Sequence, residues 1–113
     1  MSVVLYHNPK CSTSRNALAL LREQGVEPTV VEYLKTGWDS DTLQRLASKT
    51  GLGLSGLLRK KEADAKALLD AGADDEAILA AAIAQPILIE RPIVETDKGA
   101  VIGRPVERVL EVL

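Results

Sequence analysis

Apolar residues in the first third of the chain form two short runs separated by a helical repeat. Residues 2–6 form a short apolar run, which indicates a buried strand. After a polar turn, residues 16–24 have helical spacing, and Gly25 stands where a helix commonly ends. The apolar face of that helix consists of Ala17, Leu18 and Leu21. Residues 29–34 then read as a second strand, so the pattern predicts a parallel strand pair with a right-handed crossover.

The middle third of the chain has helical periodicity. Asp39 or Ser40 is suited to cap a helix whose apolar face consists of Leu43, Leu46 and Ala47. A glycine-containing break at residues 51–53 separates it from a short helix over 54–58. Further helices are expected over 65–69 and 75–84, and the second of these should turn four residues inward: Ile78, Leu79, Ala82 and Ile83.

The last third returns to strand. Residues 87–89 and 90–95 are expected to be extended, and a turn at 97–99 leads to a partner strand at 100–102. Pro105 opens a final helix with a continuous apolar stripe that consists of Val106, Val109, Leu110 and Leu113.

The order of elements predicts an α/β fold with a thioredoxin-like core, β-α-β then β-β-α, a mixed sheet and a helical insertion. We expect a single domain over residues 1–113, with the core at 2–34 and 86–113 and the insertion at 39–85. The chain's one cysteine follows the first strand, where a thioredoxin-like active site places it.

Composition narrows the classes of function. The formal net charge of −2 gives no reason to expect a nucleic-acid or membrane partner. A single Cys cannot form an internal disulfide, and one His leaves no credible zinc site. The sequence shows neither a signal peptide nor a transmembrane span, and a lone reduced thiol then predicts a cytoplasmic protein.

Cys11 stands at the predicted strand-to-helix junction, where free backbone N–H groups and the helix dipole stabilise an anion. The thiolate is the nucleophilic form of cysteine. Lys10, Arg15 and His7 are close enough in sequence to add positive charge. Free cysteines are often buried and inert, but this polar and basic surrounding sequence favours a reactive thiol.

Three arginines have the chemistry of an oxyanion site. Arg91 and Arg104 each precede a proline, which biases both toward extended backbone, and Arg59 ends a short apolar element. The guanidinium group binds two oxygens of an oxyanion at once. An arginine is usually a solvated surface charge, so only convergence of the three on Cys11 would make them a site.

Three stretches of sequence carry a family resemblance: residues 7–15 around the cysteine, residues 57–60, and residues 86–94 together with Arg104-Pro105 and Val109-Leu110. In this order and spacing the chain resembles the glutaredoxin-coupled arsenate reductase family, whose thioredoxin-like fold has a helical insertion and whose members serve arsenic detoxification.

The resemblance assigns roles. It implies that Cys11 is the nucleophile and that the oxyanion ligands are Arg59, Arg91 and Arg104. It further implies that His7 tunes the thiolate, and that Ser14 or Arg15 helps to close the anion loop. We also expect a cis Arg91–Pro92 bond, no tightly bound cofactor, and arsenate or a related oxyanion as substrate.

Reduction of arsenate to arsenite takes two electrons and hence two thiols, but this chain has one. The second thiol must come from outside, and the resemblance identifies it as glutathione with glutaredoxin. The C-x5-R loop of cysteine phosphatases is absent because Ala17 holds the arginine position, and Ser14 replaces the second cysteine of C-x-x-C. Three alternatives stay open: a monothiol glutaredoxin-like activity, a redox-responsive regulator of the same fold that binds RNA polymerase, and a relative acting on an unknown substrate.

Overall fold

A computed structural model describes residues 2–113. Their contacts divide the chain into two compact units: the residues up to Thr36 together with Arg91–Leu113, and Gly37–Glu90. We call them the first and the second unit and describe each by itself. The single domain with an insertion stays a prediction, and Met1, which it includes, lies outside the described residues.

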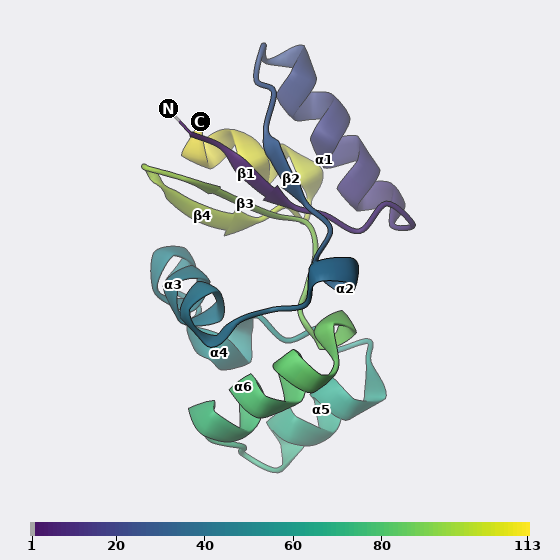
Figure 1. Cartoon of the computed structure of the whole chain (residues 1–113), viewed down its shortest axis with the longest axis vertical. Coiled ribbons are helices and arrows are strands. Elements are labelled where there is room, and N and C mark those ends of the chain that lie inside the picture. The colour runs from purple at the N-terminus through teal and green to yellow at the C-terminus, as the bar shows by residue number, and fades with distance from the viewer. Residues whose placement is uncertain (1) are drawn as a thin grey trace. The chain divides into compact units, whose positions relative to one another are not determined.

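The first unit contains a four-stranded mixed sheet with the order β2-β1-β3-β4 (Figure 1). Its strands are β1 (Val4–Tyr6), β2 (Thr29–Val31), β3 (Ile93–Thr96) and β4 (Gly99–Ile102). β1 runs parallel to β2 and antiparallel to β3, and β4 is antiparallel to β3. The mixed thioredoxin-like sheet predicted from the order of elements is therefore confirmed.

One face of this sheet is covered by α1 (Ser12–Glu23) and by the 3₁₀ helix η2 (Val106–Val112), drawn in yellow in Figure 1. Register places Leu5 opposite Val94 and Val94 opposite Val101, so these three side chains point to the same face. They form the core with five further buried residues: Val3, Ala17, Leu21, Val109 and Val112. The predicted stripe at 106–113 is thus partly a core face, although Leu110 is 42% exposed.

The second strand is shorter than predicted. β2 ends at Val31, and Tyr33–Thr36 form the single helical turn α2. The N–H groups of Lys35 and Thr36 donate to the carbonyl of Glu32 at 2.9 and 3.1 Å, which closes that turn. Tyr33 is fully buried. An apolar, β-branched run predicted strand, but the turn-closing hydrogen bonds of the backbone decide the conformation.

The hairpin between β3 and β4 turns at Asp97 and Lys98 and is tied to the end of the chain. The hydroxyl of Thr96 donates to the carbonyl of Val112 at 2.7 Å and accepts the N–H of Lys98 at 3.0 Å. These bonds fix η2 to the hairpin that leads into the Arg104 segment.

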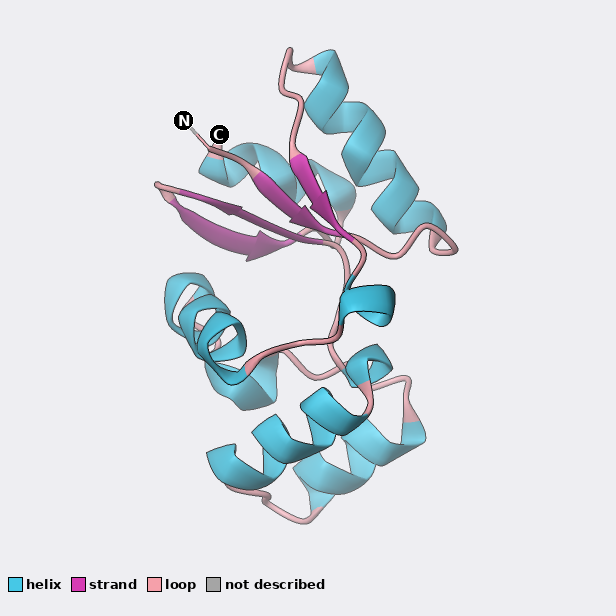
Figure 2. Cartoon of the chain, viewed as in Figure 1, coloured by secondary structure: helices cyan, strands magenta, loops and turns pink. Residues whose placement is uncertain are grey.

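The second unit is helical (Figure 2), with α3 (Ser40–Thr50), α4 (Gly53–Gly56), α5 (Ala63–Asp70), α6 (Asp75–Ala84) and the 3₁₀ turn η1 (Pro86–Leu88). Asp39 caps α3 by accepting the N–H of Thr42 at 2.7 Å, as the sequence predicted. Within the described chain, no helix has the length and apolar character needed to span a membrane.

Two expectations for this unit are wrong. Residues 87–89 do not form a strand, because the turn η1 occupies 86–88 and only an isolated antiparallel bridge joins Ile89 to Leu58. On α6, Ile78 and Ala82 are buried, but Ile83 is 44% exposed. All residues of α6 after its first turn are apolar, so its sequence gives no contrast that selects the inward face.

Candidate active site

The cysteine lies in the loop between β1 and α1, residues 7–11 (Figure 2), and Asn8 organises that loop. The carbonyl of Asn8 accepts the N–H of Cys11 at 3.0 Å, and its side-chain Oδ1 accepts the N–H of Lys10 at 3.0 Å. Its own N–H donates to Ser14 Oγ at 3.1 Å. Asn8 is only 4% exposed, so these bonds are largely shielded from water. They hold Cys11 as the N-cap of α1.

The side chains of Ser14 and His7 form a buried polar pair. Ser14 Oγ lies 2.6 Å from His7 Nδ1 and also accepts the N–H of Asn8. Burial lowers the pKa of His7 below its ordinary value; Arg15 adds to the effect, although Glu32 opposes it. His7 is therefore neutral near pH 7, and the expectation that it adds positive charge beside Cys11 is wrong. With a neutral imidazole, the hydroxyl of Ser14 is free to donate to Nδ1.

Arg104 follows β4 in the sequence, and its side chain contacts Cys11. Its Nη2 donates to Cys11 Sγ at 3.2 Å, and its Nε donates to the carbonyl of Arg91 at 2.7 Å. The side chain of Arg91 also hydrogen bonds to the thiol. Two arginines that are 80 or more residues from Cys11 in sequence thus meet it in space.

The pKa of Cys11 lies below the ordinary thiol value. Burial is the largest influence and acts in the opposite direction, raising the pKa. It is outweighed by the N–H of Ser14 in the first turn of α1, by the hydrogen bond from Arg91, and by the positive charges of Arg104 and Arg91. A larger fraction of Cys11 is therefore in the thiolate form, which is the nucleophile, than for an ordinary cysteine at the same pH.

The other two basic residues near the cysteine in sequence have different surroundings. Arg15 is exposed, and its Nη1 donates to the carbonyl of Pro9 at 2.9 Å, which closes the outer side of the loop. Lys10 is exposed as well. The positive charge that acts on the thiol comes mainly from Arg91 and Arg104, which reach it through the tertiary fold.

The Arg91–Pro92 peptide bond is cis, as predicted. The Arg104–Pro105 bond is cis as well, which the sequence reasoning did not anticipate. Both candidate arginines of the first unit thus immediately precede a cis proline.

Gly103 allows the Arg91 and Arg104 segments to approach each other. A Cβ at this position would lie 2.9 Å from Val109 Cγ1 and 3.0 Å from Pro92 Cγ. The N–H of Gly103 donates to the carbonyl of Pro92 at 2.8 Å. Only a residue without a side chain fits between Pro92 and Val109 without displacing one of them.

Arg59 belongs to the second unit, where Glu90 binds it. Arg59 Nη1 lies 2.6 Å from Glu90 Oε1, and the two side chains are only 12% and 21% exposed. The sequence reasoning placed Arg59 with the oxyanion ligands and did not single out Glu90. The convergence of Arg59 with Cys11 stays a prediction.

The first unit thus brings together six of the predicted residues around one loop: His7, Cys11, Ser14, Arg15, Arg91 and Arg104. Sequence reasoning missed Asn8 and Glu90 as candidates. The Asn-Pro pair at 8 and 9 was a usable signal for the first, since it marks turns. For Glu90, the only local signal was its position directly before Arg91.

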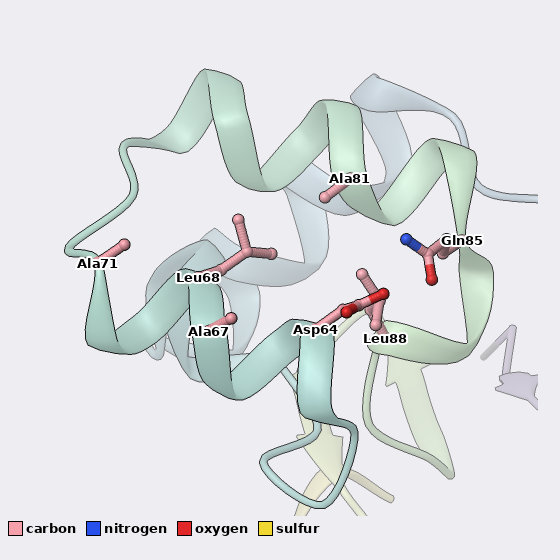
Figure 3. Close-up of a pocket in the computed structure, with 7 residues that line it drawn as sticks. All are labelled: Asp64, Ala67, Leu68, Ala71, Ala81, Gln85 and Leu88. Atoms are coloured by element: carbon pink, nitrogen blue, oxygen red, sulfur yellow. The ribbon is translucent and has the colours of Figure 1, made fainter.

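A separate cleft of about 310 Å³ lies between α5 and α6 in the second unit (Figure 3). Figure 3 shows Ala67, Ala81 and Leu68 along its walls, with Asp64 and Gln85 toward one end. Its one ionisable lining residue is Asp64, whose charge would repel an oxyanion, and no predicted site residue lines it. In the described part of the chain, no three His, Cys, Asp or Glu side chains are grouped as metal ligands would be.

Comparison with known proteins agrees with this geometry. The family model described as ArsC family matches residues 6–112. The chain is 43% identical to an arsenate reductase of Rhizobium meliloti, over 100% of this chain and 82% of that protein. It is 46% identical to the uncharacterised protein YfgD of Escherichia coli, over 98% and 96% respectively.

A solved structure described as an arsenate reductase from Vibrio cholerae superposes with a TM-score of 0.91 and 48% identity, covering 100% of this chain and 98% of that one. The family match spans the cysteine loop, the Arg59 segment and the Arg91 and Arg104 segments. The chain belongs to the ArsC family.

Proposed function

We propose that this protein reduces arsenate to arsenite, with Cys11 as the nucleophile and glutathione with glutaredoxin as the external thiol donors. The observation that carries the proposal is the placement of Arg104 Nη2 3.2 Å from a thiol whose pKa is lowered. A positive group next to a thiolate allows it to approach an anionic substrate that it would otherwise repel. Two arsenate reductases support the choice of substrate: they are 43% and 40% identical to this chain, over 100% and 99% of its length.

The proposed reaction starts with the Cys11 thiolate. It attacks arsenic and forms an S–As bond, while one arsenate oxygen takes up protons and leaves as water. Glutathione then attacks the sulfur of Cys11. A disulfide forms, the S–As bond breaks, and its electron pair stays on arsenic as As(III). Glutaredoxin with a second glutathione releases Cys11 from the mixed disulfide. The chain has no second cysteine, so the external thiol is required by the electron count.

We assign the anion ligands as Arg91, Arg104 and Arg59, and the supporting residues as His7, Ser14 and Arg15. Arg91 and Arg104 bind the oxyanion and lower the pKa of the thiol. Arg59 is included on its sequence motif. His7 acts through Ser14, whose backbone N–H faces the thiol, and Arg15 closes the loop over Pro9. No tightly bound cofactor is part of the proposal, and a cytoplasmic setting suits a reaction that consumes reduced glutathione.

The proposed regulator of RNA polymerase has less support, because such proteins usually have a second cysteine where this chain has Ser14. A coupled assay distinguishes arsenate reduction from an activity on a different oxyanion. It would contain arsenate, glutathione, glutaredoxin, glutathione reductase and NADPH. We expect arsenate-dependent NADPH oxidation with the wild type and none with Cys11→Ser. Absence of arsenate-dependent oxidation in the wild type would contradict the proposal.

A further inference from the structure

Lys10 and Arg15 are two basic residues beside Cys11 whose charges the thiol does not use. Both side chains are exposed to solvent. The pKa of Cys11 is lowered by a backbone N–H of α1 and by two arginines from distant segments, and neither Lys10 nor Arg15 contributes to this shift. Their charges therefore remain available to a molecule that approaches the thiol from solvent.

The two residues are held at one peptide group of the cysteine loop. Arg15 Nη1 donates to the carbonyl of Pro9 at 2.9 Å, and this carbonyl belongs to the peptide bond that joins Pro9 to Lys10. The N–H of the same peptide group donates to Asn8 Oδ1 at 3.0 Å. The turn is closed by the N–H of Cys11, which donates to the carbonyl of Asn8 at 3.0 Å. The fold thus fixes the guanidinium of Arg15 and the backbone of Lys10 together, directly before the thiol.

No carboxylate offsets these two charges. The first turn of α1 contains no acidic residue. Among residues 2–113, neither Lys10 nor Arg15 takes part in an ion pair. Further along the same helix, Arg22 differs, because it pairs with Glu27 at 3.0 Å. Neighbouring positive charges without counterions attract an anion, so the mouth of the cysteine loop favours an anionic reactant.

We propose that Lys10, together with Arg15, binds the carboxylates of glutathione and thereby makes Cys11 selective for this anionic thiol donor. The inference rests on the proposed function, in which glutathione supplies the second thiol. Glutathione has two carboxylates that are ionised at neutral pH, one on each side of its cysteine. A guanidinium and an ammonium group both form charge-assisted hydrogen bonds with carboxylates. A neutral thiol cannot make these contacts and gains nothing from the two cations.

Thiol–disulfide exchange tests the proposal without arsenate. The Cys11 thiolate attacks one sulfur of oxidised glutathione, the S–S bond breaks, and one glutathione leaves as a thiolate. Cys11 is oxidised to the mixed disulfide, and one glutathione sulfur is reduced. The chain has a single cysteine, so the intact mass follows one product. The same rate is measured with hydroxyethyl disulfide, which is neutral, and with cystamine, which is cationic. We define donor selectivity as the rate constant for oxidised glutathione divided by that for hydroxyethyl disulfide.

Lys10→Gln should lower the donor selectivity about three-fold, which is the scale of an exposed ion pair. Lys10→Glu should lower it about ten-fold and should raise the rate with cystamine, because the charge is reversed. Arg15→Gln should also lower the selectivity, whereas Arg15→Lys keeps the charge and should retain most of it. High salt should reduce the selectivity of the wild type, since exposed charges are screened.

Two controls separate recognition from general reactivity. Arg22→Gln removes an exposed charge from the same helix roughly 16 Å further along its axis, beyond the screening length, and should leave the donor selectivity unchanged. Iodoacetamide is neutral, and Lys10 does not contribute to the lowered pKa of Cys11. The dependence of alkylation rate on pH should therefore be the same in Lys10→Gln and in the wild type.

An unchanged donor selectivity in Lys10→Gln would overturn the inference, and so would an equal slowing with all three disulfides. If circular dichroism shows that Lys10→Gln does not fold, the wild type decides: a selectivity that does not change with salt overturns the inference. The coupled arsenate assay separates the two claims. Selectivity as expected without arsenate turnover contradicts the proposed function alone. Arsenate turnover together with an unaltered selectivity in Lys10→Gln contradicts the recognition of glutathione alone.

Discussion

Arg104 in the first unit and Arg59 in the second are held by different kinds of acceptor. Arg104 Nε donates to the uncharged carbonyl of Arg91, while its Nη2 reaches the thiol. Arg59 Nη1 donates to the carboxylate of Glu90. A carbonyl orients a guanidinium and leaves its charge intact, whereas a carboxylate orients it and offsets the charge. Arg104 therefore keeps its net positive charge, whereas the Arg59–Glu90 pair has little net charge.

The largest expected effect is the loss of Arg104. Arg104→Ala should lower kcat/KM by about 2–4 kcal/mol of transition-state stabilisation, the scale of a lost oxyanion donor. Arg104→Lys should not restore it, because an ammonium cannot bond the Arg91 carbonyl and the anion with one planar group. Arg59→Ala should lose less, because Arg91 and Arg104, and not Arg59, are the arginines that lower the pKa of Cys11.

Steady-state kinetics on all three variants check this ranking. Thermal melting is recorded alongside, because Arg59→Ala leaves a mostly buried Glu90 without its partner and costs stability. Equal losses of kcat/KM at positions 59 and 104 would remove the distinction between the two arginines.

A methyl group at position 103 should disturb the first unit alone. In Gly103→Ala the new Cβ meets Val109 and Pro92 at 3.0 Å or less, so one of them must move. We expect a stability loss of about 1–3 kcal/mol, as for overpacking, together with displacement of the Arg91 and Arg104 segments. Urea unfolding measures the first effect and the alkylation rate of Cys11 the second. Gly72→Ala, in the second unit, is the control: it has a strained positive φ but no close neighbour, and should leave the alkylation rate unchanged.

Asn8 offers a smaller change at the loop. Asn8→Ala removes the acceptor for the N–H of Lys10 and should cost about 1 kcal/mol of stability, with a modest rise in the pH at which Cys11 becomes reactive. Asn8→Asp keeps the acceptor but places a negative charge at a buried position near the thiol, so it should also cost stability and should raise the pKa of Cys11. Alkylation rates against pH for both variants test this. If Asn8→Asp lowered that pH, the electrostatic account of the loop would be wrong.

The smallest effect concerns stability against pH. The folded-state pKa of Cys11 is lowered, so between that pKa and the unfolded value of about 8.5 the unfolded chain binds more protons at this group. The contribution of Cys11 to stability is fully present above the unfolded value and is lost as pH falls through the folded pKa. The difference in unfolding free energy between wild type and Cys11→Ser should therefore grow as pH rises through this window. A difference that does not vary with pH would mean that the thiol has no altered pKa.

Local patterns in the sequence were sufficient for the parts of the fold that short-range physics decides. The Asp39 cap, the helix after Cys11 and the β3–β4 hairpin all follow from residues close in the chain. The cis Arg91–Pro92 bond came from family resemblance, which gave no warning of the second cis bond at Pro105.

The features that the sequence did not reveal depend on distant partners. The Arg59–Glu90 pair exists because Leu58 and Ile89 bridge two segments about 30 residues apart, and the first of these segments has the pattern of a short helix. The neutrality of His7 results from burial, whereas its basic neighbours in sequence suggested a charge. In α6, an unbroken apolar run gave no indication that Ile83 is exposed.

Cys11 is both the reactive thiol and the residue that begins α1. Its thiolate is an anion at the positive end of a helix dipole, so the helix stabilises the thiolate and the thiolate stabilises the first turn. Once the sulfur is bound to arsenic or to another sulfur, it carries no charge and that mutual stabilisation is lost. Amide hydrogens in the first turn of α1 should then exchange with solvent faster in the covalent intermediates than in the resting protein. The first turn of α1 would therefore be less stable while Cys11 is covalently modified, and would regain its stability when the thiolate is restored.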